Sequence, residues 1–171
     1  EYNLAAYVVP IGRPAVGVSQ GGESFLADID AAQPADHTAS GFYVPNPHNY
    51  VVGNAASGGW SGFSYPIFYS TIETSQHITF DPSTFPVLRF EGNTAHSSGY
   101  FWGDAGCIYF GGHLWKEGTT LKYSNGRYTH KTATNSDTGM QQWHNVTHTR
   151  AWLCEKGFSS WGVYVDIDHF E

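Results

Sequence analysis

Two pairs of acidic residues, each spaced two positions apart, are the first feature of this sequence that could carry out chemistry. Asp28 and Asp30 form one pair, and Asp166 and Asp168 form the other. If these segments are strands, both carboxyl groups of a pair lie on one face, because side chains alternate along a strand. Glycoside hydrolysis needs two carboxylates flanking a groove. Alternate acidic residues more commonly form the solvated face of a strand, and the spacing favours that interpretation.

Aromatic residues in glycine-rich segments indicate a second kind of chemistry, the binding of sugars. Asp104 follows Trp102 and Gly103, so it has aromatic neighbours that could stack on a sugar ring. The predicted carbohydrate-binding residues are Trp60, Tyr100, Phe101, Trp102, Asp104 and Trp115. The same aromatic residues could equally cover the ends of the fold or a partner subunit. No catalytic residue is assigned.

The nine histidines do not form a metal-binding pattern. His144 and His148 are four residues apart, which suits one face of a helix, but the residues between them favour a strand. The sequence also lacks a phosphate-binding glycine loop that opens a helix. We therefore predict no metal and no cofactor.

Composition narrows the class of protein and its partners. The chain has 171 residues, enough for one domain, with 15 Asp and Glu against 8 Lys and Arg. Because no basic run could neutralise several phosphates at once, nucleic acid is not an expected partner. No apolar run approaches the roughly 20 residues that span a bilayer, so this segment is not expected to insert into a membrane. Abundant glycine and aromatic residues favour turns and strands over helices.

Two weak signals favour an oxidising compartment. Cys107 and Cys154 could form one disulfide or remain two buried thiols, and their number does not decide between these states. Asn145, Val146 and Thr147 form an N-glycosylation acceptor triplet, which matters only in an exported chain. Together these features predict an extracellular or cell-surface location.

A pattern of short strands recurs three times along the chain. In each copy an apolar strand runs into an asparagine, small residues follow, and another apolar strand begins after a glycine. The copies occupy residues 41–47, 49–58 and 62–68, then 87–97 and 106–111, then 143–147, 151–154 and 162–167. Each copy would form one coil of the chain. A single coil cannot bury its own apolar face, so successive coils must stack on one another. We predict structural corners at Asn54, Asn93 and Asn145, where asparagine tolerates left-handed backbone angles and can bond to the next coil.

Spacing alone leaves two all-β folds open. Asn93 follows Asn54 by 39 residues and Asn145 follows Asn93 by 52, which is not a regular period. A β-sandwich with unrelated loop asparagines fits as well as a β-helix. We treat residues 1–171 as a single segment, in which residues 1–40 are less regular and cap or continue a preceding coil.

Residues 41–58 and 90–97 resemble a known family. They are similar to the β-helix region of fibrocystin-like receptors and of the cell-migration-inducing, hyaluronan-degrading (CEMIP-type) extracellular proteins. In that family an Asn-Pro-x-Asn turn and an Asn-Ala-Ala corner precede a Gly-aromatic strand, as residues 46–65 do here. A later Asn-x-Ala-His-Ser corner matches residues 93–97, where His96 is expected to hydrogen-bond the turn. The resemblance covers the middle third closely and the last third only by pattern.

The resemblance implies a right-handed parallel β-helix that is part of a longer solenoid. Its implied role is a structural or interaction module of a larger secreted or cell-surface assembly, with flanking coils or other chains as partners. The alternatives are a hyaluronidase-like, polysaccharide-acting enzyme and a carbohydrate-binding module, either with an extracellular polysaccharide as partner. The family's hydrolytic residues have no counterpart in this sequence, so the prediction leans against an enzyme. The β-rich domain that precedes the family's β-helices is also not found here.

Overall fold

The computed structural model describes residues 1–8, 39–71, 73–99, 106–117, 120–124, 142–160 and 164–171. Within these residues the chain is all-β, apart from two three-residue 3-10 helices, Glu73–Ser75 (η2) and Pro82–Thr84 (η3). The strands are β1 (Leu4–Val8), β2 (Ser40–Tyr43), β3 (Tyr50–Val52), β4 (Ala55–Gly58), β5 (Ser61–Phe68), β6 (Arg89–Glu91), β7 (Thr94–His96), β8 (Ile108–Glu117), β9 (Thr120–Ser124), β10 (His144–Trp152), β11 (Phe158–Ser160) and β12 (Val165–Phe170).

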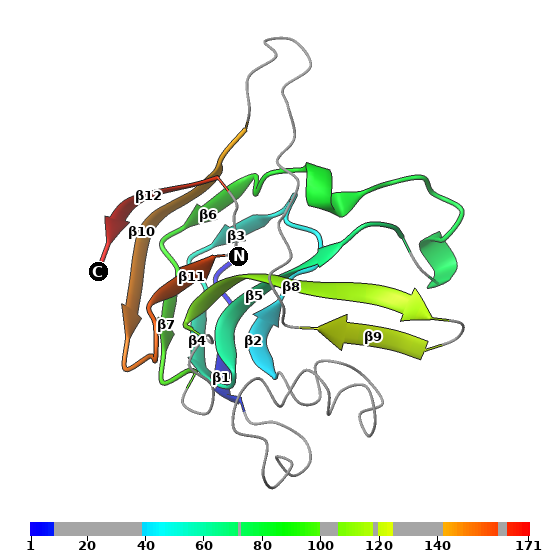
Figure 1. Ribbon diagram of the computed structural model, residues 1–171. Coiled ribbons are helices and arrows are strands. Elements are labelled where there is room, and N and C mark those ends of the chain that lie inside the picture. The colour runs from blue at the N-terminus through cyan, green and yellow to red at the C-terminus, as the bar shows by residue number, and fades with distance from the viewer. Residues whose placement is uncertain (9–38, 72, 100–105, 118–119, 125–141, 161–163) are drawn as a thin grey trace, which may run out of the picture.

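The strands stack in parallel as the chain winds through successive coils (Figure 1). Sheet 1 contains β3, β6, the first half of β10, and β12; sheet 2 contains β1, β4, β7 and the second half of β10; sheet 3 contains β2, β5, β8 and β11. Each complete coil visits the sheets in the same order, as β3, β4 and β5 do, and then β6, β7 and β8. The predicted parallel, all-β class is therefore confirmed in a β-helix-like arrangement.

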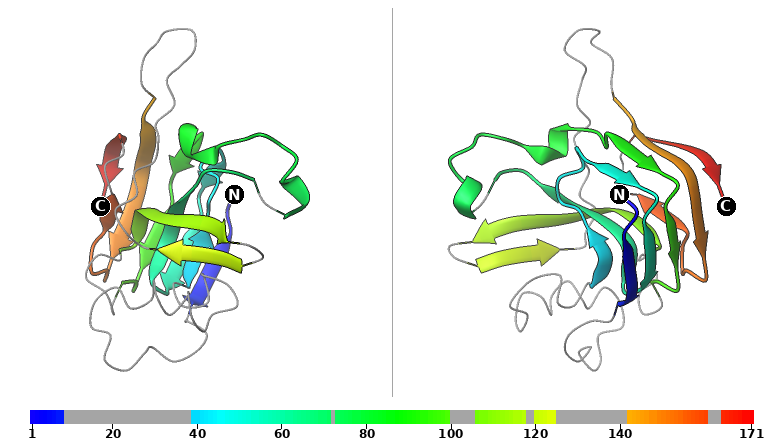
Figure 2. Two further views of the ribbon diagram at one scale, coloured as in Figure 1. Left: turned by 45° about the vertical axis from the view of Figure 1, so that its right-hand side comes forward. Right: turned by 180° about the vertical axis from the view of Figure 1, so that it is seen from behind.

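The stack has two ends. In Figure 2 the strands β1 and β12 lie on opposite sides of it. The strand pairing agrees with this arrangement. In sheet 2, β1 pairs with β4, β4 with β7 and β7 with β10. In sheet 1, β12 pairs with β10.

The core is built from columns of side chains that repeat from coil to coil. In sheet 1, Val51 is level with Phe90 and Phe90 with Val146, and all three are buried. In sheet 3, the rings of Tyr65 and Phe110 are nearly parallel, with centroids 4.3 Å apart. In-register parallel strands place like side chains directly above one another, so each column excludes water along the stack.

A column of glycines and alanines keeps the interior narrow where sheets 2 and 3 face each other. Ala56 and Ala95 are level with each other in sheet 2 and are buried. A β-carbon added to Gly62 of sheet 3 would lie 2.7 Å from the β-carbon of Ala95 and 2.8 Å from the carbonyl oxygen of Cys107. The glycine is required here because the two sheets approach too closely for any side chain.

One hairpin departs from the stack. β9 pairs antiparallel with the second half of β8, from His113 level with Ser124 to Glu117 level with Thr120. Figure 1 shows this hairpin extending away from the coils. Across the described parts of the chain, no helix has the length and apolar character needed to cross a membrane.

We expect Gly62→Ala to lower the free energy of unfolding by about 1 to 3 kcal/mol, because the new methyl group overpacks the contact between sheets 2 and 3. Urea unfolding followed by tryptophan fluorescence measures this. Gly157→Ala is the matched control, since its nearest neighbour would be the ring edge of Phe170 at 3.2 Å. Equal effects at the two positions would contradict the close sheet contact.

Candidate functional site

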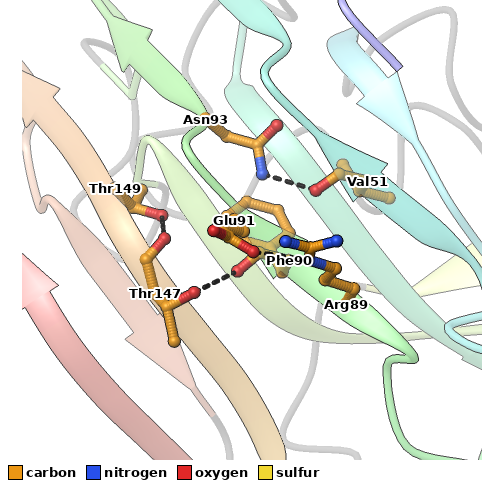
Figure 3. A network of polar contacts seen from close by, with 7 residues as sticks. All are labelled: Val51, Arg89, Phe90, Glu91, Asn93, Thr147 and Thr149. Atoms are coloured by element: carbon orange, nitrogen blue, oxygen red, sulfur yellow. Dashed lines mark hydrogen bonds and ion pairs between the residues drawn. The ribbon is translucent and has the colours of Figure 1, made fainter.

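Asparagine side chains form a ladder along the corner between sheets 1 and 2. Asn54 accepts hydrogen bonds at Oδ1 from the backbone nitrogen (3.0 Å) and Nδ2 (3.1 Å) of Asn3. Asn93 in turn accepts from the backbone nitrogen (2.9 Å) and Nδ2 (3.0 Å) of Asn54. Asn93 donates from Nδ2 to the carbonyl oxygen of Val51 at 2.7 Å, as Figure 3 shows. Because Asn54 and Asn93 are buried, these bonds satisfy backbone groups that the bend would leave unpaired.

The residue before each corner position has a left-handed backbone conformation. These residues precede Asn3, Asn54, Asn93, Thr149 and Phe170, the last of which is level with Thr149. The φ angles are 55° at Tyr2, 65° at Gly53, 64° at Gly92, 48° at His148 and 52° at His169. The sequence prediction gave this conformation to the asparagines. In the structure two residues share the role, since the preceding residue makes the bend and the asparagine bonds to the neighbouring coil.

Asn145 does not lie at a corner, contrary to the sequence prediction. It is the second residue of β10, exposed, and level with Asp166 of β12. The corner position of this coil is Thr149, which is buried and precedes Arg150, the residue level with Thr94. Thr149 donates its hydroxyl hydrogen to the carbonyl oxygen of Thr147 at 3.0 Å (Figure 3). The predicted corner was displaced by four residues.

The structure places His96 at the end of β7, next to the second bend of its coil. Its Nδ1 lies 3.0 Å from the hydroxyl of Ser97, and Ser97 has a φ angle of 58°. The imidazole stacks on the ring of Trp152, which is level with it on the next coil, at a centroid distance of 4.6 Å. His96 therefore lies beside this bend and contacts the side chain of Ser97, the residue with the left-handed conformation.

Cys107 and Cys154 form a disulfide, with their Cα atoms 5.7 Å apart. Cys107 immediately precedes β8 and is fully buried, and Cys154 lies in the turn between β10 and β11. The bond joins two consecutive coils across a sequence separation of 47 residues. Closing a loop of this length restricts the unfolded chain by roughly 4 kcal/mol in the chain-entropy account.

Two of the six predicted carbohydrate-binding residues, Trp60 and Trp115, lie in the described part of the chain. Trp60 is fully buried and packs edge-on against Tyr109, with ring centroids 4.8 Å apart, so the prediction that it is exposed was wrong. Trp115 is partly buried on β8 and stacks on His113, which is also partly buried and whose pKa burial lowers. The remaining candidates, together with two acids weighed for hydrolysis, lie outside the described residues: Tyr100, Phe101, Trp102, Asp104, Asp28 and Asp30.

The outward face of sheet 1 carries charged side chains near the corner. Arg89 and Glu91 of β6 form an ion pair through Nε and Oε2 (Figure 3). The hydrogen bond from Arg89 lowers the pKa of the Glu91 carboxyl. Asp166 and Asp168 lie on β12 and are exposed, as their alternate spacing predicted. Among the described residues, no group of three or more His, Cys, Asp or Glu side chains could hold a metal ion.

A surface hollow of about 640 Å³ opens on this same face, where β10 and β12 begin. It is lined by Pro86, Val87, Leu88, Gln142, Trp143, Asn145 and Asp166. The backbone nitrogen of Val87 donates to Nδ1 of the buried His144 at 3.1 Å, which fixes one wall against β10. The volume of the hollow lies within the range of about 300 to 1,000 Å³ typical of small-ligand sites.

Asn3 and Thr149 also occupy corner positions, although neither was predicted from the sequence. Both share the spacing that marks the other corners, in which an alanine follows two positions later: Ala5 after Asn3 and Ala151 after Thr149. A search for asparagine or threonine followed by x-Ala finds both. Trp143 was also missed as a surface residue, although its spacing from Asn145 on a strand places both on one face.

Stacked parallel strands, joined by bends that a side-chain ladder supports, define a β-helix-like protein. The sequence profile of the CEMIP beta-helix family matches residues 15–102. The chain belongs to this family, as its resemblance predicted.

Curated relatives match at least 97% of the chain. A G8 domain-containing protein of Dictyostelium discoideum is 44% identical over 170 residues, which cover 97% of this chain and 12% of that protein. Protein rliB of the same organism is 40% identical over 98% of this chain and 16% of its own length. Communication mutant protein F, also from Dictyostelium discoideum, is 40% identical over 100% of this chain and 16% of its own length.

The chain therefore spans less than a fifth of each of these relatives, whose names do not describe an enzyme. No solved structure is found to match it.

We expect Asn93→Ala to lower the free energy of unfolding by about 2 to 4 kcal/mol, because it leaves the backbone nitrogen of Asn54 and the carbonyl of Val51 without their buried partner. Urea unfolding measures this free energy. The protein is produced without glycosylation, so that the control variant at Asn145 changes only the side chain. Asn145→Ala, an exposed asparagine, is the control and should change stability by less than about 0.5 kcal/mol. A loss below about 1 kcal/mol at Asn93 would refute a stabilising role for the ladder.

Proposed function

We propose that this segment is part of a right-handed parallel β-helix in a larger extracellular or cell-surface protein. Its role there is structural: it provides a rigid, stacked surface to which flanking coils or other chains attach. We propose no catalytic activity for it, and the acids described on sheet 1 have the character of a solvated strand face.

The observation that carries this proposal is the exposure of a core position at the end of the stack. Ile167 of β12 is level with Val146, so it continues the column of Val51, Phe90 and Val146. Those three residues are buried, whereas Ile167 is 42% exposed. An apolar side chain in a core column is stabilised only when another layer covers it. A further coil, from the same protein or a partner, would supply that layer.

The opposite end of the stack also exposes large apolar and aromatic side chains, although the core residue there, Val51, is buried. Four large apolar or aromatic residues at this end are exposed, namely Tyr2, Leu4, Tyr7 and Tyr50. Uncovered strand edges and apolar ends invite aggregation, and solenoid proteins normally cover them with caps or further coils. The small share of the relatives' length that this chain spans supports the same interpretation.

The extracellular location is supported by the disulfide. Disulfides persist in oxidising compartments and are rare in the cytosol. The bond between Cys107 and Cys154 joins consecutive coils of the stack, so its formation is compatible with the native register. An acidic chain without basic clusters also suits a role that does not involve nucleic acid.

We expect Ile167→Asp in the intact protein to destabilise β12 strongly, because a covering coil would bury the new charge. Hydrogen exchange measured by mass spectrometry should show amides of residues 165–170 exchanging at least about tenfold faster than in the unmodified protein. Asp168→Ser, an exposed position on the same strand, is the control and should leave exchange unchanged. Unaltered exchange in Ile167→Asp would mean that this end of the stack is uncovered, and the proposal would fail.

A further inference from the structure

The glycosylation triplet lies on a strand whose outward face also carries an aromatic ring. Asn145 and Thr147 alternate with the buried residues His144 and Val146 along β10. Trp143 immediately precedes β10 and is 49% exposed. Because side chains alternate along a strand, Trp143, Asn145 and Thr147 project from the same face of sheet 1.

Asn145 lies in the wall of the hollow on this face, so a sugar attached to its side chain would lie beside the hollow. Asn145 and Trp143 both line it, with Leu88 and Asp166 from the neighbouring segments. The indole of Trp143 is held by the ring of Tyr164, which meets it edge-on at a centroid distance of 5.2 Å. The backbone nitrogen of His144 also donates to the carbonyl oxygen of Tyr164 at 2.9 Å. The ring therefore has a fixed position beside the asparagine.

We propose that Asn145 carries an N-linked glycan whose first N-acetylglucosamine occupies this hollow and packs against Trp143. The apolar face of a sugar ring suits an indole, and Gln142 and Asp166 provide polar groups in the lining for its hydroxyl and acetamido groups. The inference rests on the extracellular location proposed above. It assigns the hollow to the protein's own glycan and not to a free ligand.

The modification itself is a group transfer from a lipid-linked oligosaccharide diphosphate. The side-chain nitrogen of Asn145 forms a bond to the anomeric carbon of the first sugar. The bond from that carbon to the diphosphate oxygen breaks, the lipid diphosphate leaves with its electron pair, and the amide nitrogen passes one proton to a base of the transferring enzyme. No oxidant or reductant is involved.

The transfer precedes folding of this coil. In the folded chain the hydroxyl of Thr147 donates to the carbonyl oxygen of Phe90 at 3.4 Å, and Val146 is buried. The transferring enzyme must reach the whole triplet, so it acts on the extended chain. When β10 then joins β6, Val146 becomes level with Phe90 and the sugar on the preceding residue is brought into the hollow.

The test compares forms of the intact protein secreted by a eukaryotic host. Mass spectrometry of the peptide containing Asn145 measures occupancy. An endoglycosidase that leaves only the first sugar then gives a trimmed form, and Asn145→Gln gives a sugar-free form. Hydrogen exchange of β10 amides is measured in both forms, each with and without Trp143→Ala.

We expect exchange in β10 to be about threefold to tenfold faster in the sugar-free form than in the trimmed form, as for loss of one aromatic contact. With Trp143→Ala this difference should disappear. Trp152→Ala is the control. Trp152 is the last residue of β10 and is similarly exposed, but it stacks on His96, so the difference should persist there.

Three results would overturn the inference. An unmodified Asn145 in protein recovered from the medium would exclude the glycan while leaving the proposed function intact. A glycan whose effect on exchange is unchanged by Trp143→Ala would exclude packing in the hollow. Recovery of the protein only from the cytosol would overturn both the glycan and the extracellular location.

Discussion

Every strand of the stack depends on backbone hydrogen bonds to the neighbouring coils. A three- or four-residue strand such as β3 or β4 has too few partners within its own coil to be stable. Its donors and acceptors are satisfied only when the neighbouring strand lies in register. Register also aligns the apolar side chains into columns, so hydrogen bonding and core packing impose the same constraint.

The corner between sheets 1 and 2 is where this constraint is hardest to meet, because a bend interrupts the regular pairing. A left-handed residue allows the bend, and the following asparagine restores the bonds across coils. The two roles differ in their sequence requirement. Glycine, tyrosine and histidine all occupy the bend, whereas asparagine holds the buried rungs at Asn54 and Asn93. In the next coil Thr149 occupies the corner position. Its hydroxyl donates to the carbonyl oxygen of Thr147 in its own strand, so the ladder of bonds between coils ends there.

The sequence predicted the all-β class, the family and the corners at Asn54 and Asn93, because these depend on local turn chemistry. The corner of the next coil was misplaced at Asn145, since an asparagine after an apolar strand resembles a rung whether it points inward or outward. Only the pairing of β10 with β7 reveals that Thr149 takes this position. The burial of Trp60 could not be foreseen either, because it depends on contact with Tyr109 of another coil. The pairing of Cys107 with Cys154 was likewise left open by their number alone.

The register of the coils is tested most directly by engineered disulfides across sheet 1. Tyr50 and Arg89 are level on adjacent parallel strands and both exposed, and strands about 4.8 Å apart lie within the range that a disulfide spans. The pair Tyr50→Cys with Arg89→Cys should therefore oxidise readily in the folded protein. Pairing Tyr50→Cys with Glu91→Cys offsets the residues by two positions, to roughly 8 Å, and should not. Preferential oxidation of the offset pair, or no bond in either variant, would contradict the stacked, in-register coils.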